Sequence, residues 1–366
     1  MQIGLDATPL LGRRTGIGVY VRRLTEELAG RSDEVDVVAT AFTLRGAGDL
    51  ACRLPPGPRT RNLPVPARLL RRVWGRTEFP PVEWLCGRVD VFHGTNFILP
   101  PPGRASGVVT VHDLSFLRFP ETVSTASLSY RELVPRSIRR AAIVCALTEA
   151  MADDIAEEYG IDRDRVVVTP PGVDVAWFDS EPLDVDERRR IGLPGRYILA
   201  VGTLEPRKNL PLLVAAYRQL RLDDPEIPAL VLVGPEGWGP ALQVDSLPTG
   251  SVLITGYLDD ETLRSVVAGA ACLAFPSVYE GFGLPPVEAL ACGVPVVATD
   301  LPVTREVLGS AARLVPSGDV DALADGLRGA TATPSTAEEI AARQLQARAW
   351  TWGRCADATI EAYRRA

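Results

Sequence analysis

The chain has 366 residues, and because single hydrophobic cores rarely grow beyond about 250–300 residues, two domains are expected. Apolar residues make up 46% and charged residues 23% of the sequence, which excludes an intrinsically disordered chain. The formal net charge of -7 disfavours nonspecific binding to a phosphate backbone, so no nucleic-acid partner is expected.

Short apolar runs alternate with amphipathic segments along the chain, which is typical of parallel sheets covered by helices on both faces. Strands are expected at residues 2–5, 35–40, 89–93, 107–112, 143–146 and 166–169, and then at 197–202, 229–233, 252–255, 272–275, 295–298 and 312–315. Helices are expected at 19–31, 126–142 and 149–159. The sequence therefore predicts an α/β fold of two doubly wound, Rossmann-like domains facing a central cleft.

The domain limits are expected at residues 1–178 and 179–346, because a Pro-rich turn and a charged run separate the two strand series. A helix at about 347–366 is expected to pack back on the N-terminal domain, since Trp350 and Trp352 carry too much aromatic surface to leave in water. No secretory pattern and no run of about 18 apolar residues occurs. A cytoplasmic protein is expected, and peripheral contact with the inner face of the membrane stays open.

The first glycine motif is Thr15-Gly16-Ile17-Gly18, between the first strand and a helix. Gly16 and Gly18 would let the backbone approach a phosphate closely, although the third glycine of a dinucleotide fingerprint is absent. That absence also disfavours an NAD oxidoreductase.

Residues 59–76 interleave six arginines with apolar side chains. They are Arg59, Arg61, Arg68, Arg71, Arg72 and Arg76, with Leu69, Leu70, Val73 and Trp74 between them. Such a segment can lie on an anionic membrane surface, or it can be a solvated helix in a chain that uses arginine almost exclusively. Both interpretations stay open.

The two histidines, His93 and His112, each end a predicted strand, and Asn96 and Asp113 follow them. A histidine at a strand end is usually a partly buried, hydrogen-bonded residue. Ligands of doubly wound sheets bind outside the carboxyl ends of the strands, however, so all four residues are candidates for a site.

Residues 201–209, Val-Gly-Thr-Leu-Glu-Pro-Arg-Lys-Asn, directly follow the first strand of the second half. Lys208 is the only lysine in the protein. The guanidinium of Arg207 and the ammonium of Lys208 together suit two phosphates and the negative charge that grows on a leaving oxygen.

Residues 275–300 carry a strand end, a glycine loop and a helix start, with Glu280 in the loop and Glu288 in the first turn of the helix. Each carboxylate can accept hydrogen bonds from paired hydroxyls. This segment resembles the signature of glycosyltransferase family four, retaining enzymes of the GT-B fold, whose acidic pair falls on Glu280 and Glu288. Residues 201–209 resemble the family's pyrophosphate-binding element, and Val-His-Asp-Leu-Ser-Phe at 111–116 resembles a strand end of bacterial mannosyltransferases, where the histidine lies by the transferred sugar.

The resemblance implies a retaining hexosyltransferase that moves a sugar, with mannose from GDP-mannose as first choice, to a hydroxyl of a glycolipid or polysaccharide precursor of the cell envelope. UDP-glucose or UDP-N-acetylglucosamine as donor, and a noncatalytic sugar-nucleotide-binding homologue, are the alternatives. It implies catalytic roles for His112, Arg207, Lys208 and Glu280. It implies donor binding by Gly16, Gly18, Gly202, Thr203, Tyr257, Leu258, Gly281, Phe282, Gly283, Leu284 and Glu288, and acceptor binding by His93, Asn96 and Asp113.

No metal and no cofactor besides the nucleotide sugar are expected, because Arg207 and Lys208 can balance a diphosphate. The three Asp-x-Asp pairs, at residues 162/164, 184/186 and 319/321, are interpreted as turns and helix caps.

Overall fold

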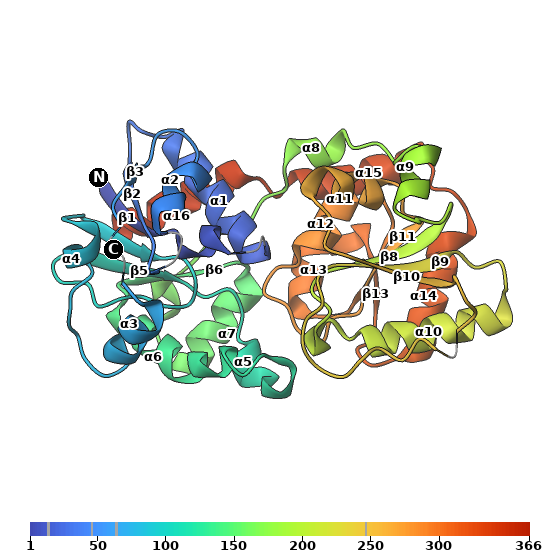
Figure 1. Ribbon diagram of the computed structural model, residues 1–366, viewed down its shortest axis with the longest axis horizontal. Coiled ribbons are helices and arrows are strands. Elements are labelled where there is room, and N and C mark those ends of the chain that lie inside the picture. The colour runs from blue at the N-terminus through green and yellow to red at the C-terminus, as the bar shows by residue number, and fades with distance from the viewer. Residues whose placement is uncertain (13–14, 45–46, 63–64, 246) are drawn as a thin grey trace. The chain divides into compact units, whose positions relative to one another are not determined.

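The computed structural model describes residues 1–12, 15–44, 47–62, 65–245 and 247–366. Its contacts divide the chain into two compact units. Unit 1 consists of Met1–Leu117, Thr125–Gly172 and Thr351–Ala366, and unit 2 of Arg118–Ser124 and Val173–Trp350 (Figure 1). Besides the short stretch Arg118–Ser124, the chain changes unit at 172/173 and 350/351, close to the limits at 178/179 and 346/347 that the sequence predicts.

The described part of unit 1 forms a parallel sheet of seven strands in the order β3-β2-β1-β4-β5-β6-β7. Its strands are β1 (Gln2–Asp6), β2 (Asp36–Thr40), β3 (Arg59–Thr60), β4 (Val91–Gly94), β5 (Ser106–Thr110), β6 (Ile143–Ala146) and β7 (Val166–Val168). Its helices are α1 (Gly16–Ala29), α2 (Leu50–Arg53), α3 (Ala67–Trp74), α4 (Glu83–Cys86), α6 (Tyr130–Arg140), α7 (Glu149–Tyr159) and α16 (Trp352–Arg365), while α5 (Ser115–Arg118) ends at the change of unit.

The described part of unit 2 forms a parallel sheet of six strands in the order β10-β9-β8-β11-β12-β13. Its strands are β8 (Tyr197–Val201), β9 (Ala229–Val233), β10 (Val252–Gly256), β11 (Cys272–Phe275), β12 (Val296–Thr299) and β13 (Arg313–Val315). Its helices are α8 (Val175–Phe178), α9 (Val185–Arg190), α10 (Leu210–Asp223), α11 (Asp260–Ala268), α12 (Leu284–Ala291), α13 (Pro302–Leu308), α14 (Val320–Ala332) and α15 (Ala337–Arg348).

The central strands explain why the apolar runs are continuous rather than alternating. Every residue of β6 and of β11 is buried, as expected for parallel strands with helices on both faces. The predicted α/β fold of two Rossmann-like sheets is confirmed. The two-residue strand β3 was not predicted, because it lies in the arginine-rich segment and both of its residues are exposed.

Each sheet has one point at which the strand order reverses. In unit 1 the reversal lies between β1 and β4, and in unit 2 between β8 and β11. Crossover helices leave in opposite directions there, so a crevice opens at the carboxyl ends of the two strands. These two crevices are the places in the fold where a ligand is expected.

The end of the chain contains two helices, not the single helix predicted for 347–366. Trp350 belongs to unit 2, where its ring contacts Phe282 and its N–H donates to the carbonyl of Val307 at 3.0 Å. Trp352 starts α16 in unit 1 and is buried. The expectation that both tryptophans pack on the N-terminal domain is wrong for Trp350, because α15 ends at Arg348 and the chain enters unit 1 only at Thr351.

The arginine-rich segment 59–76 comprises β3 and α3, while Leu63, Pro64 and the Arg68 side chain lie outside what is described. Leu70 and Trp74 are buried, and only Leu69 of the apolar side chains is strongly exposed. The apolar side of α3 therefore faces the interior of unit 1. Among the described residues, no helix combines the length and the apolar character needed to cross a bilayer.

Candidate functional site

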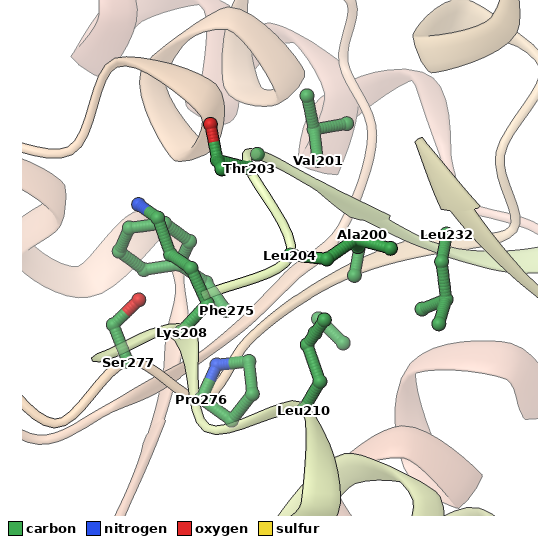
Figure 2. A pocket seen from close by; sticks show the side chains of 12 residues that line it. Ala200, Val201, Thr203, Leu204, Lys208, Leu210, Leu232, Phe275, Pro276 and Ser277 are labelled. Atoms are coloured by element: carbon green, nitrogen blue, oxygen red, sulfur yellow. The ribbon is translucent and has the colours of Figure 1, made fainter. Parts of the chain in front are cut away.

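The crevice of unit 2 holds a pocket of about 280 Å³, its open mouth included, between the ends of β8 and β11 (Figure 2). The residues after β8 contribute Gly202, Thr203 and Lys208 to its wall, and those at and after β11 contribute Phe275 and Ser277. The reversal of strand order thus brings together two segments that lie about 70 residues apart in the chain.

The absence of a side chain at Gly202 leaves room for the side chain of Lys208. Gly202 adopts φ +147°, and a Cβ built on it would come within 3.2 Å of Cε of Lys208, so a larger residue is disfavoured on both grounds. The turn η6 (Pro206–Lys208) ends at Asn209 in a left-handed conformation, which asparagine tolerates better than most residues. The Lys208 ammonium then lies 5.2 Å from the centre of the Phe275 ring (Figure 2).

Four charged side chains form a buried cluster at this pocket. Lys208 Nζ donates to Oε1 of Glu280 at 2.7 Å, Arg207 Nη1 lies 2.6 Å from Oε2 of Glu280, and Arg207 Nη2 lies 2.6 Å from Oε1 of Glu205. The side chains are between 8% and 16% exposed. Arg207 also donates to the carbonyl of Tyr279, and its own carbonyl accepts from the N–H of Val278, which joins the two loops.

The cluster controls the ionisation of Glu280. Burial alone would raise the pKa of this carboxyl, but the charges of Arg207 and Lys208 outweigh burial and lower the pKa to about 2. Glu280 is therefore an anion at neutral pH. Two of its roughly four acceptor positions face the cations, so the others can accept ligand hydroxyls.

Glu205 was not among the predicted site residues. It pairs with Arg207, so the two cations already meet two carboxylates before any ligand arrives. The prediction that Arg207 and Lys208 balance a diphosphate overlooked this neutralisation. The signal was present in the sequence, because Glu205 stands two residues before Arg207.

The loop after β11 provides the other predicted donor residues. Gly283 caps α12 with φ +92°, and a Cβ there would meet the Phe275 ring at 3.4 Å. Phe282 is buried against Trp350 and serves packing, Gly281 is buried, and Leu284 starts the helix. Glu288 lies in the second turn of α12 rather than the first.

Two donor residues predicted after β10 lie at the edge of the same sheet. Tyr257 is 54% exposed and Leu258 is half-buried. Neither lines the pocket at β8 and β11, whereas Gly202 and Thr203 do. Among the predicted site residues of unit 2, the structure brings together Gly202, Thr203, Arg207, Lys208 and Glu280. Tyr257 and Leu258 lie outside this pocket.

In unit 1, His93 is a core residue. It is fully buried, with Nδ1 2.8 Å from the hydroxyl of Tyr363 and Nε2 2.7 Å from the hydroxyl of Thr110. Burial, with a smaller effect of His112, lowers its pKa to about 3. Both ring nitrogens are engaged inside the core, so the structure does not support the predicted acceptor contact.

His112 lies two residues beyond β5 and keeps one nitrogen for other partners. Its Nε2 donates to the carbonyl of Thr95 at 2.8 Å, and Nδ1 has no hydrogen bond to another described residue. Burial lowers the pKa of His112 to about 4, although Thr95 and Asp113 oppose this shift. The imidazole is thus neutral near pH 7, with Nδ1 as an acceptor.

Asp113 positions a loop. Its Oδ1 accepts from the N–H of Ser115 at 2.9 Å and from the Ser115 hydroxyl at 2.6 Å, which starts α5. Asn96 follows β4 and lines a separate pocket of unit 1.

Gly16 and Gly18 lie inside the first turn of α1, not between the first strand and the helix as predicted. The hydroxyl of Thr15 accepts from the Gly18 N–H at 3.3 Å and caps the helix. The Gly18 N–H is therefore not available to a phosphate. This argues against the predicted role of Gly18 in phosphate binding.

The Asp-x-Asp pairs act as predicted in turns and caps. Asp162, Asp184 and Asp319 each accept a backbone N–H at the start of a helical turn. The part of the chain that the structure describes has no group of three or more His, Cys, Asp or Glu arranged to hold a metal ion.

Comparisons with known proteins agree with this geometry. Residues 15–172 match the model of a glycosyl transferase 4-like domain, and residues 195–332 match that of the glycosyl transferases group 1. O-antigen chain mannosyltransferase B of Escherichia coli is 32% identical over 75% of this chain and 74% of its own length. A D-inositol 3-phosphate glycosyltransferase of Kineococcus radiotolerans is 30% identical over 98% of this chain and 92% of its own.

Among solved structures, HepE of Anabaena in complex with UDP-glucose superposes with a TM-score of 0.69 at 18% identity, over 99% of this chain and 98% of that one. This likeness concerns the fold. Taken with the two domain matches and with the relatives of at least 30% identity, it identifies the chain as a GT-B glycosyltransferase of family four.

Proposed function

We propose that the protein is a retaining hexosyltransferase that transfers mannose from GDP-mannose to a hydroxyl of a carbohydrate or lipid-linked acceptor. The observation that carries this proposal is the contact of Arg207 and Lys208 with Glu280 in the crevice between β8 and β11. The similarity to O-antigen chain mannosyltransferase B supports mannose as the sugar.

In the proposed reaction, the bond between the sugar C1 and the diphosphate oxygen breaks and a bond from C1 to the acceptor oxygen forms on the same face. Arg207 and Lys208 stabilise the negative charge that grows on the leaving diphosphate. The acceptor proton passes to a leaving-phosphate oxygen, so no protein nucleophile is needed. Glu280 accepts hydrogen bonds from sugar hydroxyls and so orients the donor. His112 is proposed to take part in catalysis as a neutral imidazole.

The identity of the donor can be tested by measuring the thermal stability of the protein with different nucleotide sugars. Thermal shifts with GDP-mannose, UDP-glucose, UDP-N-acetylglucosamine and ADP-glucose report which nucleotide sugar binds the folded state, since binding raises the midpoint by mass action. UDP-glucose is the main competitor, because HepE binds it. The largest shift with GDP-mannose, followed by turnover and an α-linked product by NMR, is the expected result. A donor that binds without turnover would support the noncatalytic alternative.

The proposed reaction uses no metal and no cofactor besides the nucleotide sugar. The support is the cation pair itself, although Glu205 and Glu280 partly neutralise it. Turnover is expected to continue at the full rate in the presence of EDTA. If EDTA abolished turnover and Mg²⁺ or Mn²⁺ restored it, a metal-independent reaction would be excluded.

Peripheral contact with an anionic membrane surface is proposed for one patch of unit 1. The rings of Phe79 and Trp84 are 55% and 64% exposed and lie 4.9 Å apart. The exposed Arg76 stands three residues before Phe79 in the chain, and exposed aromatic rings together with arginines are typical of membrane-surface segments. This patch replaces α3 as the apolar part of the proposed contact, because α3 buries Leu70 and Trp74 and exposes only Leu69 among its described large apolar side chains.

A further inference from the structure

The charged cluster at the pocket of unit 2 contains as many carboxylates as cations. Arg207 pairs with Glu205 and Glu280, and Lys208 pairs with Glu280, each at 2.6 or 2.7 Å. Among the described residues that line the pocket, Lys208 is the only charged one. The two cations and the two carboxylates cancel, so the cluster offers a diphosphate no net positive charge before a ligand binds.

The guanidinium of Arg207 is oriented by protein partners. Its Nη1 donates to the carbonyl of Tyr279 at 3.0 Å and contacts Glu280, and its Nη2 donates to Oε1 of Glu205 at 2.6 Å. Nη1 has two hydrogens, and both are used in these contacts. Arg207 does not line the pocket, so a diphosphate that lies beside Lys208 also experiences the charges of Arg207 and Glu205 behind it.

The backbone holds Glu205 in this place. Its N–H donates to the Thr203 carbonyl at 2.8 Å, and its carbonyl accepts from the Lys208 N–H at 3.1 Å. The neighbouring loop after β9 leaves little room for movement, because a Cβ on Gly237 would lie 2.4 Å from the carbonyl oxygen of Leu204. The side chain of Glu205 is 8% exposed. A ligand therefore meets a fixed negative charge.

The proposed reaction changes the charge of the nucleotide beside this carboxylate. A nucleotide sugar carries about two negative charges on its diphosphate, and the leaving diphosphate keeps that charge at first, because it takes the acceptor proton. A terminal phosphate has a second pKa near 6, so above that pH the product releases the proton to solvent and carries about three negative charges. Charges repel more strongly in a buried cluster than in water, so a fixed carboxylate opposes the product more than the donor.

We propose that Glu205 discriminates between the nucleotide sugar and the nucleoside diphosphate product, and that its charge promotes release of the product. Glu205 acts by cancelling the charge of Arg207. The cluster stays neutral as a result, and the additional charge of the product gains no attraction. The inference rests on the proposed function.

Calorimetry on the full chain at pH 8 tests the proposal with three ligands. GDP carries the additional charge, its β-methyl ester lacks both that charge and the sugar, and GDP-mannose has the charge of the ester together with the sugar. The corresponding uridine ligands take their place if the thermal shifts select UDP-glucose. The wild type should bind GDP and the methyl ester with affinities within about threefold, because a neutral cluster does not favour the additional charge.

Glu205→Gln should change affinity according to ligand charge. The variant keeps the shape of the side chain and leaves the cluster with a net positive charge, so GDP should gain about three- to fivefold in affinity relative to the methyl ester. The inhibition constant of GDP should fall relative to the KM of GDP-mannose by a similar factor. The gain in affinity of GDP-mannose over the methyl ester should stay as in the wild type, because Glu280 is intact. This last measurement separates the role of Glu205 from that of Glu280.

Glu236→Gln is the matched control. Glu236 lies after β9 at the same edge of the sheet, where its backbone bridges to Leu204, and its side chain is exposed and pairs with no described cation. All three affinities should equal those of the wild type. Glu205→Asp keeps the negative charge and should keep the wild-type ratio of GDP to methyl ester, which distinguishes an effect of charge from an effect of the exact contact.

Wild-type protein that binds GDP about tenfold or more tightly than the methyl ester would overturn the proposal without any variant. An unchanged ratio in Glu205→Gln, or the same shift in Glu236→Gln, would also overturn it. Weaker binding of all three ligands to Glu205→Gln would do so too, since Glu205 would then only support Arg207. The expected ratios without turnover of any nucleotide sugar would count against the proposed function alone, whereas turnover with unchanged ratios would count against the role of Glu205 alone.

Discussion

The ammonium of Lys208 lies 2.7 Å from Oε1 of Glu280, although 72 residues separate the two in sequence. The contact joins the turn after β8 to the loop after β11, and it uses the only lysine of the chain. Because the ammonium and the carboxylate each have capacity left over, one pair of residues can face both the phosphate and the sugar of a donor.

Replacement of Lys208 by Ala is expected to lower kcat by about 100- to 1,000-fold, since the leaving diphosphate loses a buried positive charge. Steady-state transfer with labelled donor measures this effect. Arg189→Ala removes an exposed cation of unit 2 and should leave kcat unchanged. Comparable kcat for the two variants would exclude the proposed role of Lys208.

Gly202→Ala is expected to disturb the same lysine through the backbone. The added Cβ would meet Cε of Lys208 at 3.2 Å, so kcat should fall by about tenfold or more, as for other misplacements in an active site. Gly250→Ala is the control, because Gly250 also has positive φ but no atom within 4 Å of the added Cβ. Both variants should lose about 1–2 kcal/mol of unfolding free energy through backbone strain, and only Gly202→Ala should lose turnover. A parallel loss of turnover in Gly250→Ala would contradict this explanation.

Glu280→Gln is expected to separate sugar binding from nucleotide binding. The variant keeps the shape of the side chain and removes the anion that competes for Arg207 and Lys208, so GDP should bind at least as tightly as to the wild type. The gain in affinity of GDP-mannose over GDP should disappear, because the sugar loses its carboxylate partner. Calorimetry with both ligands measures the difference, with Glu261→Gln on the surface of α11 as control. A retained gain would mean that Glu280 does not hold the sugar.

The pH dependence of stability is expected to come largely from the histidines. The folded pKa values of His93 and His112 are about 3 and about 4, below the ordinary 6.5, so the unfolded chain binds protons first. Stability should be constant above pH 6.5 and fall as the pH drops toward 4. At pH 5 each histidine contributes a loss of about 2 kcal/mol.

Urea unfolding between pH 7 and pH 5 tests this expectation with His93→Gln. The variant should be less stable than the wild type at pH 7, because the bonds to Tyr363 and Thr110 change, but it should lose less stability on acidification. An equal loss in the two proteins would show that another group controls the transition.

Vesicle binding should depend on the aromatic patch. Removing two exposed rings by Phe79→Ser and Trp84→Ser takes away about 1.5–3 kcal/mol of apolar transfer energy per ring that is fully buried in lipid. Co-sedimentation with phosphatidylglycerol vesicles should drop, and Leu222→Ser, at an 80% exposed position of unit 2, should have no effect. Wild-type protein that fails to co-sediment would end the membrane proposal.

The sequence predicted much of the fold because its central strands are continuous apolar runs. The limits of β6, β9 and β11 match the predicted ranges, since burial on both faces leaves little choice of residue. Short exposed elements such as β3 carry no such pattern. The contact of Arg207 and Lys208 with Glu280 follows from strand order, because the two segments come directly after the neighbouring strands β8 and β11.

The side-chain environment of the histidines could not be predicted in the same way. His93 looks like a site residue because it ends β4, but Tyr363 from the last helix occupies its Nδ1, a contact across 270 residues that no local pattern encodes. Arg71 and Trp74 were assigned to a possible membrane surface, whereas α3 turns them to the pocket beside Asp6. Local charge and hydropathy do not specify which side of a short helix meets the rest of the unit.

The return of the last segment to unit 1 has a consequence for biosynthesis. Residues 351–366 complete the core that the first 117 residues begin, with Cys355 and Ile360 buried and Tyr363 bonded to His93. Residues 351–366 leave the ribosome after the residues of unit 2, so unit 1 stays unfinished while unit 2 emerges and can fold. Unit 1 therefore begins before unit 2 in the chain but can be completed only after unit 2 has emerged, which reverses the usual order for domains that fold during translation.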